Sequence, residues 1–129
     1  MNDAATDAGI AAARGVMVAH FTALNARDGT ALAATLHFPH YRLSGGSLKT
    51  WDAPAAYFGD FLARAGDGWH HSALDSVEVL AASTEKVHLD VRFTRYRADD
   101  SVLGSFRSLW VIAELDGKWA AQLRSSFAA

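Results

Sequence analysis

The feature that most constrains this chain is the alternation of apolar and polar side chains that begins near residue 70 and continues to residue 127. A period of two is typical of β-strands with one buried face. Three turn signals interrupt it, at Ser83-Thr84, Asp99-Asp100 and Asp116-Gly117, and the last dipeptide favours a type I′ hairpin. The pattern therefore predicts a meander of four antiparallel strands, over residues 70–82, 85–97, 102–114 and 118–127.

The first half of the chain has helical spacing instead. Apolar residues recur every three or four positions from Ile10 to Leu24, which predicts a helix with Thr6 or Asp7 as its N-cap and an end near Arg27. A second helix is expected over residues 30–36, where Phe38-Pro39 ends it because the residue before proline avoids helical torsion angles. The other elements expected here are a strand over 40–44 that runs into a Gly45-Gly46 turn, and a helix with Asp52 as N-cap that ends at the Gly66/Gly68 pair.

Helices followed by a meander indicate an α+β fold, a single domain over residues 1–129 in which helices cover a curved antiparallel sheet and enclose a pocket. The formal net charge of −2 argues against a nucleic-acid-binding face. No window is apolar enough for a membrane span or a signal peptide. The chain has no cysteine for a disulfide or a thiolate site. We therefore expect a cytoplasmic protein that binds neither nucleic acid nor membrane.

Counting outward from two-residue turns predicts which side chains share a face of the sheet. Three apolar pairs face one another across the middle strands: Val87–Ile112, Leu89–Trp110 and Phe93–Phe106. The last hairpin adds Ile112–Ala121, Trp110–Leu123 and Phe106–Phe127 to this face, which we expect to lie under the helices. Polar side chains on a buried face need partners or line a cavity, and the count places six of them there: Ser72, Ser76, Glu78, Arg95, Ser108 and Ser125.

Arg95 is the sharpest ligand-binding candidate in this set. An inward arginine keeps its charge and must meet either a carboxylate, here that of Glu78, or an anionic ligand. The alternative is that the register slips and Arg95 belongs to an exposed Arg-Tyr-Arg run. A bulge in the first hairpin would turn Ser72, Ser76 and Glu78 to the opposite face, so their placement depends on the register.

The opposite face of the predicted sheet mixes apolar and charged side chains. This mixture is too apolar for open solvent and too charged for a core, and it resembles a protein interface with paired charges. We therefore expect a homodimer through the outer face of the sheet. The rows that carry this prediction contain Val79, His88, Val111 and Gln122, then Val77, Asp90, Leu109 and Arg124, then Asp75, Arg92 and Arg107.

Candidate chemistry is concentrated in the segment from His37 to Arg42, beside the expected pocket. His40 is the candidate catalytic general base, because histidine titrates close to neutral pH. His37 and Arg42 are candidate ligand-binding residues, with the arginine as an anion clamp. The alternative is that these side chains cap the preceding helix and bind backbone carbonyls.

Three further residues are candidates for ligand binding: Trp51 and Tyr57 at the pocket mouth, and His70 at the start of the meander. The alternatives are ordinary core packing for the two aromatic residues and a solvated rim position for the histidine. No HxH or HExxH spacing, glycine-rich phosphate loop or nucleotide fingerprint is present, so no metal and no cofactor is expected.

Three segments resemble the nuclear transport factor 2-like (NTF2-like) superfamily, which includes SnoaL-like and ketosteroid isomerase-like domains. Residues 24–36 (LNARDGTALAATL) resemble the end of the family's first two helices, residues 51–61 its third helix, and residues 108–127 its closing hairpin. The resemblance implies a cone-shaped cavity between helices and sheet and frequent dimers packed sheet to sheet. Ketosteroid isomerase carries a general-base aspartate on the first strand, whereas the matching stretch here, residues 42–46 (RLSGG), contains no acid.

These observations support one main functional hypothesis, a domain that binds a small apolar or anionic molecule in its pocket. Two alternatives remain open. The first is a small lyase or isomerase, ketosteroid isomerase-like or polyketide cyclase-like, that uses a histidine as its base. The second is a protein–protein interaction module that uses the sheet.

Overall fold

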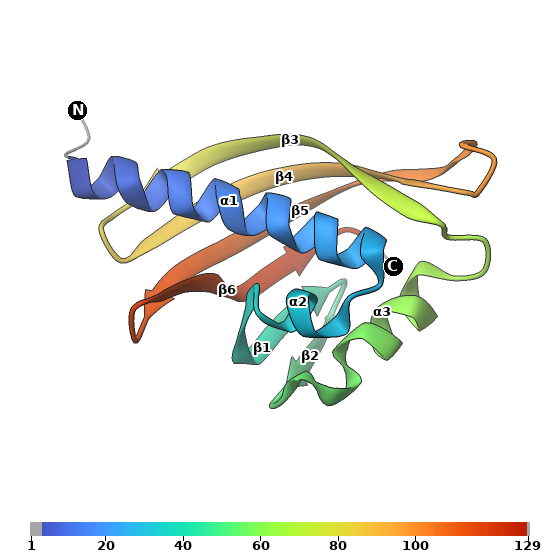
Figure 1. Cartoon of the computed structure of the whole chain (residues 1–129), viewed down its shortest axis with the longest axis horizontal. Helices are drawn as coiled ribbons and strands as arrows, with labels where there is room; N and C mark the ends of the chain where they lie inside the picture. Colours follow the sequence, from blue (N-terminus) through green and yellow to red (C-terminus); the bar gives the residue numbers. More distant parts are fainter. Residues whose placement is uncertain (1–3, 129) are drawn as a thin grey trace.

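The computed structural model describes residues 4–128. A long helix, α1, lies across one face of a curved six-stranded sheet, while two shorter helices close one end of it (Figure 1). The strand order is β2-β1-β6-β5-β4-β3, and β1 pairs with β6 in parallel while every other pair is antiparallel. The elements are α1 (Ala4–Ala26), α2 (Gly29–Ala33), β1 (Leu36–Ser44), β2 (Ser47–Trp51), the 3-10 helix η1 (Pro54–Ala56), α3 (Tyr57–Ala65), β3 (His71–Ala82), β4 (Lys86–Tyr96), β5 (Val102–Leu115) and β6 (Lys118–Ser126).

The α+β class and the four-stranded meander are confirmed, with each strand within one residue of its expected ends at most positions. Asp116 and Gly117 both have positive φ, 53° and 78°, as the type I′ hairpin requires. The apolar pairs Val87–Ile112, Leu89–Trp110 and Phe93–Phe106 are found as predicted. These pairs, with Met17 and Leu24 of α1 above them, form the core.

The first half of the chain departs from expectation in five places. The first helix begins at Ala4, so Thr6 and Asp7 lie inside it, and the second helix ends at Ala33. Phe38-Pro39 lies within β1, because the extended torsion angles preferred before proline suit a strand as well as a helix end. Asp52 is not an N-cap, since Ala53 precedes η1 without a side-chain hydrogen bond. Strand β2, which pairs with β1 across the Gly45-Gly46 turn, was not expected.

Two irregularities decide which polar side chains face the core. In β3 the register shifts between Leu74 and Ser76, so Ser72 stays opposite Arg95 while Glu78 pairs with Asp90 on the outer face. The predicted inward placement of Ser76 and Glu78 is therefore wrong, because the extra residue of a bulge inverts every side chain beyond it until the next one.

The second irregularity lies in β6. Ile112 meets Ala121 as predicted, but Val111 meets Leu123, which leaves Gln122 as the extra residue. Trp110 consequently faces Arg124 instead of Leu123, and Ser108 faces Ser126. The predicted pairs Trp110–Leu123 and Phe106–Phe127 and the inward Ser125 are wrong. The bulge brings a charged side chain to the buried face of the sheet.

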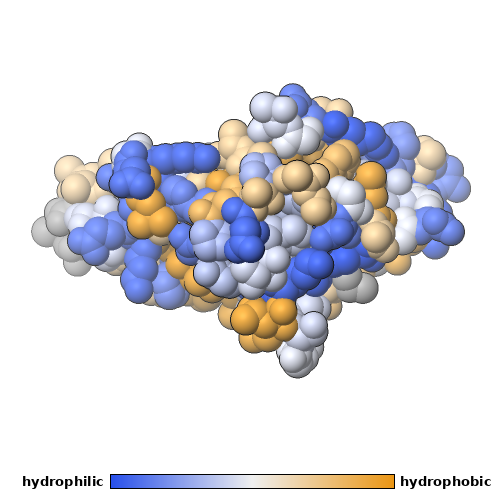
Figure 2. Space-filling view, turned by 90° about the horizontal axis from the view of Figure 1, so that it is seen from below, coloured by the Kyte–Doolittle hydropathy of each residue, from blue (hydrophilic) through white to orange (hydrophobic). Residues whose placement is uncertain are grey.

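The surface on the side of α3 and β2 is a mixture of hydrophilic side chains and small apolar patches (Figure 2). Within residues 4–128, no helix is long and apolar enough to cross a membrane.

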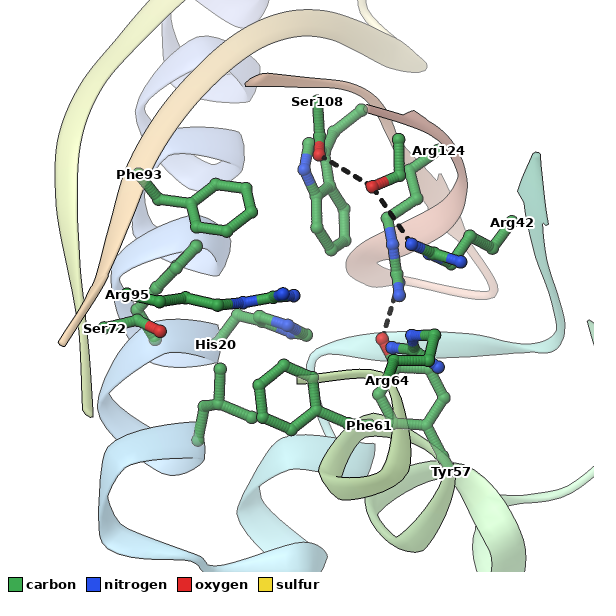
Figure 3. A pocket seen from close by; sticks show the side chains of 14 residues that line it. His20, Arg42, Tyr57, Phe61, Arg64, Ser72, Phe93, Arg95, Ser108 and Arg124 are labelled. Carbon is green, nitrogen blue, oxygen red and sulfur yellow. Dashed lines mark hydrogen bonds between the residues drawn. The ribbon is translucent and has the colours of Figure 1, made fainter. Parts of the chain in front are cut away.

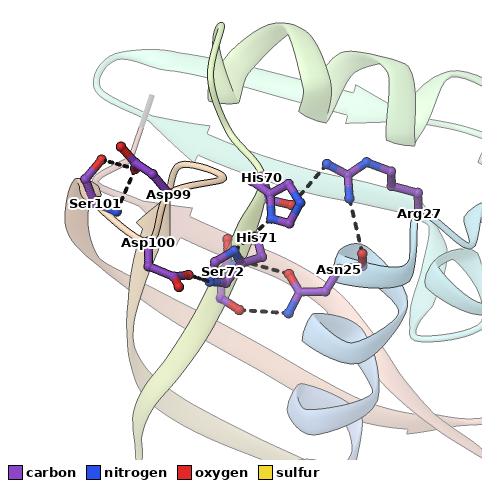
Figure 4. Close-up of polar contacts among 8 residues, drawn as sticks. All are labelled: Asn25, Arg27, His70, His71, Ser72, Asp99, Asp100 and Ser101. Carbon is purple, nitrogen blue, oxygen red and sulfur yellow. Dashed lines mark hydrogen bonds and ion pairs between the residues drawn. The ribbon is translucent and has the colours of Figure 1, made fainter.

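The C-terminal end of α1 is tied to the start of β3 by one side chain. Asn25 Nδ2 donates to the Ser72 carbonyl at 2.8 Å, and the Ser72 amide donates to Asn25 Oδ1 at 2.8 Å (Figure 4). Arg27 adds a bond from Nη2 to the His70 carbonyl at 3.0 Å. The side-chain amide of Asn25 thus replaces a neighbouring strand and satisfies both the N–H and the carbonyl group of Ser72 on the edge strand β3.

We expect Asn25→Ala to lower the free energy of unfolding by about 2 kcal/mol, because it removes two hydrogen bonds to partly buried backbone groups. Chemical denaturation followed by tryptophan fluorescence measures the change. Asn25→Asp is the matched variant: it keeps an acceptor for the Ser72 amide but loses the donor, so its loss should be smaller than that of Asn25→Ala. Equal stability of Asn25→Ala and wild type would contradict a stabilising role for the two hydrogen bonds between Asn25 and Ser72.

Candidate functional site

A cavity lies between α1, α3 and the inner face of the sheet (Figure 3). The space open to the centres of water molecules is about 40 Å³, enough for a few waters. Its walls are aromatic and cationic, so both an apolar body and a negative charge would be accommodated there. The lining residues are His20, Phe21, Leu24, Arg42, Tyr57, Phe61, Arg64, Ser72, Phe93, Arg95, Ser108, Trp110, Arg124 and Ser126.

Four of the lining side chains are arginines, and each comes from a different element: Arg42 from β1, Arg64 from α3, Arg95 from β4 and Arg124 from β6. Among the described residues that line the cavity, none is an aspartate or a glutamate. Arg42, Arg95 and Arg124 are at most 7% exposed. The cavity therefore concentrates positive charge away from water.

Aromatic rings and neutral groups hold these guanidinium groups in place. Arg124 lies 4.7 Å from the centre of the Trp110 ring and donates to the Tyr57 hydroxyl at 2.5 Å. Arg95 lies 4.9 Å from the centre of the Phe106 ring. Arg42 donates to the carbonyl oxygen of Ala128 at 2.5 Å. Stacking on ring faces and bonding to uncharged oxygens hold Arg42 and Arg124 without an acidic partner among the described lining residues.

Arg64 is the least satisfied of the four. Its Nε and Nη1 atoms are buried and have no hydrogen-bond partner among residues 4–128. Its guanidinium carbon lies 5.4 Å from the centre of the Trp51 ring, so it packs on an aromatic face instead. A buried donor without an acceptor costs free energy, and an acceptor supplied by a ligand would recover it.

The pKa values of three lining arginines reflect the free-energy cost of burying several positive charges close together. Burial, followed by repulsion from neighbouring arginines, lowers the pKa of Arg42, Arg64 and Arg95 from the ordinary arginine value to about 10 in each case. All three remain charged at neutral pH. A bound anion would relieve the repulsion, so the site favours negative ligands over neutral ones.

His40, the predicted general base, is fully buried and does not line the cavity. Its Nδ1 lies 3.1 Å from the Ala121 carbonyl and therefore carries the proton, while Nε2 accepts from Arg124 Nη1 at 2.8 Å. Burial first, and Arg124 second, lower its pKa from 6.5 to about 3. Both ring nitrogens are thus engaged, and the residue orients Arg124.

The structure brings together some of the other candidates and separates the rest. Arg42, Tyr57 and Arg95 line the cavity. Trp51 lies behind them, with its indole N–H on Asp60 Oδ2 at 2.8 Å. Three candidates lie elsewhere: His37 Nε2 is 2.9 Å from the Ala113 carbonyl, His70 is exposed beside His71, and Glu78 is on the outer face, where it cannot pair with Arg95.

Three ionisable lining residues were missed by the sequence analysis: His20, Arg64 and Arg124. For two of them the sequence contains a pattern that could have predicted an inward side chain. His20 shares the buried stripe of α1 with Met17 and Leu24, and Arg64 follows Tyr57 and Phe61 at helical spacing. No sequence pattern predicted the inward direction of Arg124, because that direction depends on the bulge at Gln122. Among the described residues, no group of three or more His, Asp or Glu side chains is placed to hold a metal ion.

No family model matches the sequence, and no curated protein is similar to it in sequence. Many solved structures are similar in fold. An NTF2-like protein with a cystatin-like fold from Novosphingobium aromaticivorans has a TM-score of 0.74 at 14% identity, with 93% of this chain and 81% of that chain covered. A cystatin-like protein of unknown function from Nostoc punctiforme has a TM-score of 0.72 at 13% identity, covering 90% and 87%.

A ketosteroid isomerase-like protein from Erwinia carotovora atroseptica has a TM-score of 0.69 at 17% identity, covering 92% of this chain and 94% of that chain. At such low identity these likenesses establish the fold alone. The chain has the NTF2-like, cystatin-like α+β fold, as the resemblance of its segments predicted.

Two buried histidines make stability depend on pH in one direction. His20 and His40 have lowered pKa values in the folded protein, whereas the same groups in the unfolded chain titrate near 6.5. The unfolded state therefore binds more protons below pH 6.5, and the free energy of unfolding should fall as pH decreases from 6.5 towards 3. Each histidine contributes a slope of up to about 1.4 kcal/mol per pH unit.

We expect His40→Gln to show a shallower loss of stability than wild type between pH 7 and pH 5, measured by urea denaturation at several pH values. His88→Gln, on the outer face of β4, controls for the loss of a histidine as such. A slope in His40→Gln equal to that of wild type would contradict a neutral, buried His40.

Proposed function

We propose that this chain of NTF2-like fold binds a small organic anion, a short-chain carboxylate, in the cavity between its helices and sheet. The observation that carries the proposal is the convergence of four guanidinium groups on a cavity without an acidic side chain among its described lining residues. Guanidinium groups recognise carboxylates through paired, charge-assisted hydrogen bonds. Several buried guanidinium groups around a cavity whose described lining holds no acidic side chain favour the binding of an anion.

The remaining walls define the rest of the ligand. Phe21, Leu24, Phe61 and Phe93 offer apolar contacts opposite the cationic side. The free space, about 40 Å³ open to the centres of water molecules, favours a molecule of few heavy atoms. A larger ligand would have to displace arginine side chains. The site therefore fits a short carboxylate with an aliphatic body better than an extended aromatic acid.

A catalytic use of His40 is not part of this proposal. Its Nε2 lone pair accepts a hydrogen bond from Arg124, and its Nδ1 proton is held by a backbone carbonyl, so a substrate proton has no free acceptor there. The lyase or isomerase alternative would need another base. Binding of an anion rests on charge and geometry that are already in place.

Calorimetric titration of the protein with acetate and propionate, and with acetamide and propionamide as uncharged isosteres, tests the proposal. A low-chloride buffer avoids competition by the buffer anion. We expect one carboxylate per chain and no measurable binding of either amide, because the amide lacks the charge that the arginines favour. Equal binding of acid and amide, or no binding of any carboxylate, would contradict the proposal.

The same titration with Arg64→Met should show at least about tenfold weaker binding of carboxylate. Met fills much of the volume of the arginine stem without a charge, so the ligand-free variant should remain folded. Arg92→Met is the matched control, because Arg92 lies on β4 but is exposed on the outer face. It should bind the carboxylate as wild type does.

A second candidate property, a homodimer, is favoured by the outer face of the sheet. Arg107 Nε and Nη2 donate to the two carboxylate oxygens of Asp90 at 2.9 and 2.8 Å, next to the partly buried Leu109 and Val111. Leu123 beside Val111 is 40% exposed. Paired charges of both signs among apolar side chains suit a second copy of the same face related by a two-fold axis.

Analytical ultracentrifugation at high micromolar concentration checks the dimer. We expect a mass of two chains for wild type and of one chain for Leu123→Glu, since a charge at the centre of an apolar contact opposes its burial. Leu62→Glu, an exposed leucine on α3 away from this face, should remain dimeric. A monomeric wild type would contradict the proposal.

A further inference from the structure

His20 is a buried group of the cavity whose role the anion site does not explain. It lies in the middle of α1, is 5% exposed, and its ring projects into the cavity close to Arg95 (Figure 3). The ring packs edge-on against Trp110 at 5.1 Å between centres. The position is therefore held from two sides, by its own helix and by the sheet.

A hydrogen-bond chain determines which ring nitrogen of His20 carries the proton. Thr35 Oγ1 donates its single proton to the Leu32 carbonyl at 2.7 Å. The same oxygen lies 2.8 Å from His20 Nδ1, and because its proton is already used it can only accept there. Nδ1 of His20 is consequently the protonated nitrogen, and Nε2 keeps a lone pair.

The surroundings keep this imidazole neutral. Burial, and after it the positive charges of Arg124 and Arg64, lower the pKa of His20 well below 6.5. Arg95 is a further polar neighbour in the cavity. The cavity thus combines arginines and the unpartnered indole N–H of Trp110, which are all donors, with one nitrogen acceptor. An acceptor in such a site is complementary to a ligand that carries a donor.

We propose that the ligand of this cavity is a small hydroxycarboxylate, whose carboxylate meets the arginines and whose hydroxyl donates a hydrogen bond to Nε2 of His20. This inference rests on the proposed carboxylate site and names its ligand class. A carboxylate without a hydroxyl would leave the buried acceptor unmatched, so the site discriminates against it. His20 is on this view a binding and specificity residue.

Titration calorimetry with three probes tests the inference: glycolate, acetate, which lacks the hydroxyl, and methoxyacetate, whose ether oxygen has no proton to donate. We expect glycolate to bind about tenfold more tightly than either of the others, the effect of one hydrogen bond to a buried acceptor. In His20→Phe, glycolate and acetate should bind with about equal affinity, and the affinity for acetate should stay within a few-fold of that of wild type. His37→Phe, a histidine outside the cavity, should keep the preference.

A second set of measurements keeps the inference falsifiable if His20→Phe does not fold. Nitrogen-15 NMR of wild type at pH 7 should show His20 as a neutral ring protonated at Nδ1, and glycolate should shift the Nε2 resonance. Thr35→Val removes the acceptor that fixes this tautomer, so it should reduce the glycolate preference as well. A ring protonated at Nε2, or a Nε2 resonance that glycolate leaves unchanged, would overturn the inference.

The two proposals fail in distinguishable ways. If acetate binds and glycolate binds no better, the carboxylate site stands and the hydroxycarboxylate inference is wrong. If no carboxylate binds at all, both are wrong. Retention of the glycolate preference in a folded His20→Phe would leave the ligand class but overturn the role of His20.

Discussion

The burial of four guanidinium groups close to one another is the constraint on which the cavity of this domain depends. Four arginines from four elements converge on one small cavity, and three of them have pKa values lowered to about 10 by burial and by one another. Such charges persist in a folded protein only where surrounding groups over-determine their positions. Here those groups are aromatic faces, a tyrosine hydroxyl, a histidine lone pair and the carbonyl of Ala128.

The hydrogen-bond partners of Arg42 and Arg124 named above are neutral, so they position these two guanidinium groups without cancelling their charge. Arg124 bonds to Tyr57 and His40, both uncharged, so its full charge stays directed at the cavity. A carboxylate in either place would have neutralised the site and removed its affinity for anions. The two inner histidines complete the arrangement, because each is held neutral and given one tautomer by its hydrogen-bond partners.

Different residues determine the fold and line the cavity, which explains why structures of 13–17% identity share this fold. The sheet and α1 need only apolar volume and correct turn chemistry, which many sequences supply. The chemistry depends on a few inward positions that can be exchanged without altering the scaffold. The arginines that line the cavity of this chain occupy such positions.

The sequence by itself determined the class, the meander and the core pairs, because a period of two, an Asp-Gly turn and apolar cross-strand neighbours are local signals. It also named Arg95, Arg42 and Tyr57 as candidates, and all three line the cavity, while their role in binding stays a prediction. Only the tertiary structure decided the rest of the site. One extra residue at Gln122 turns Arg124 inward, and one at Asp75 turns Glu78 outward. The position of a bulge is determined by the packing of neighbouring strands and helices, so no local sequence pattern predicted either bulge.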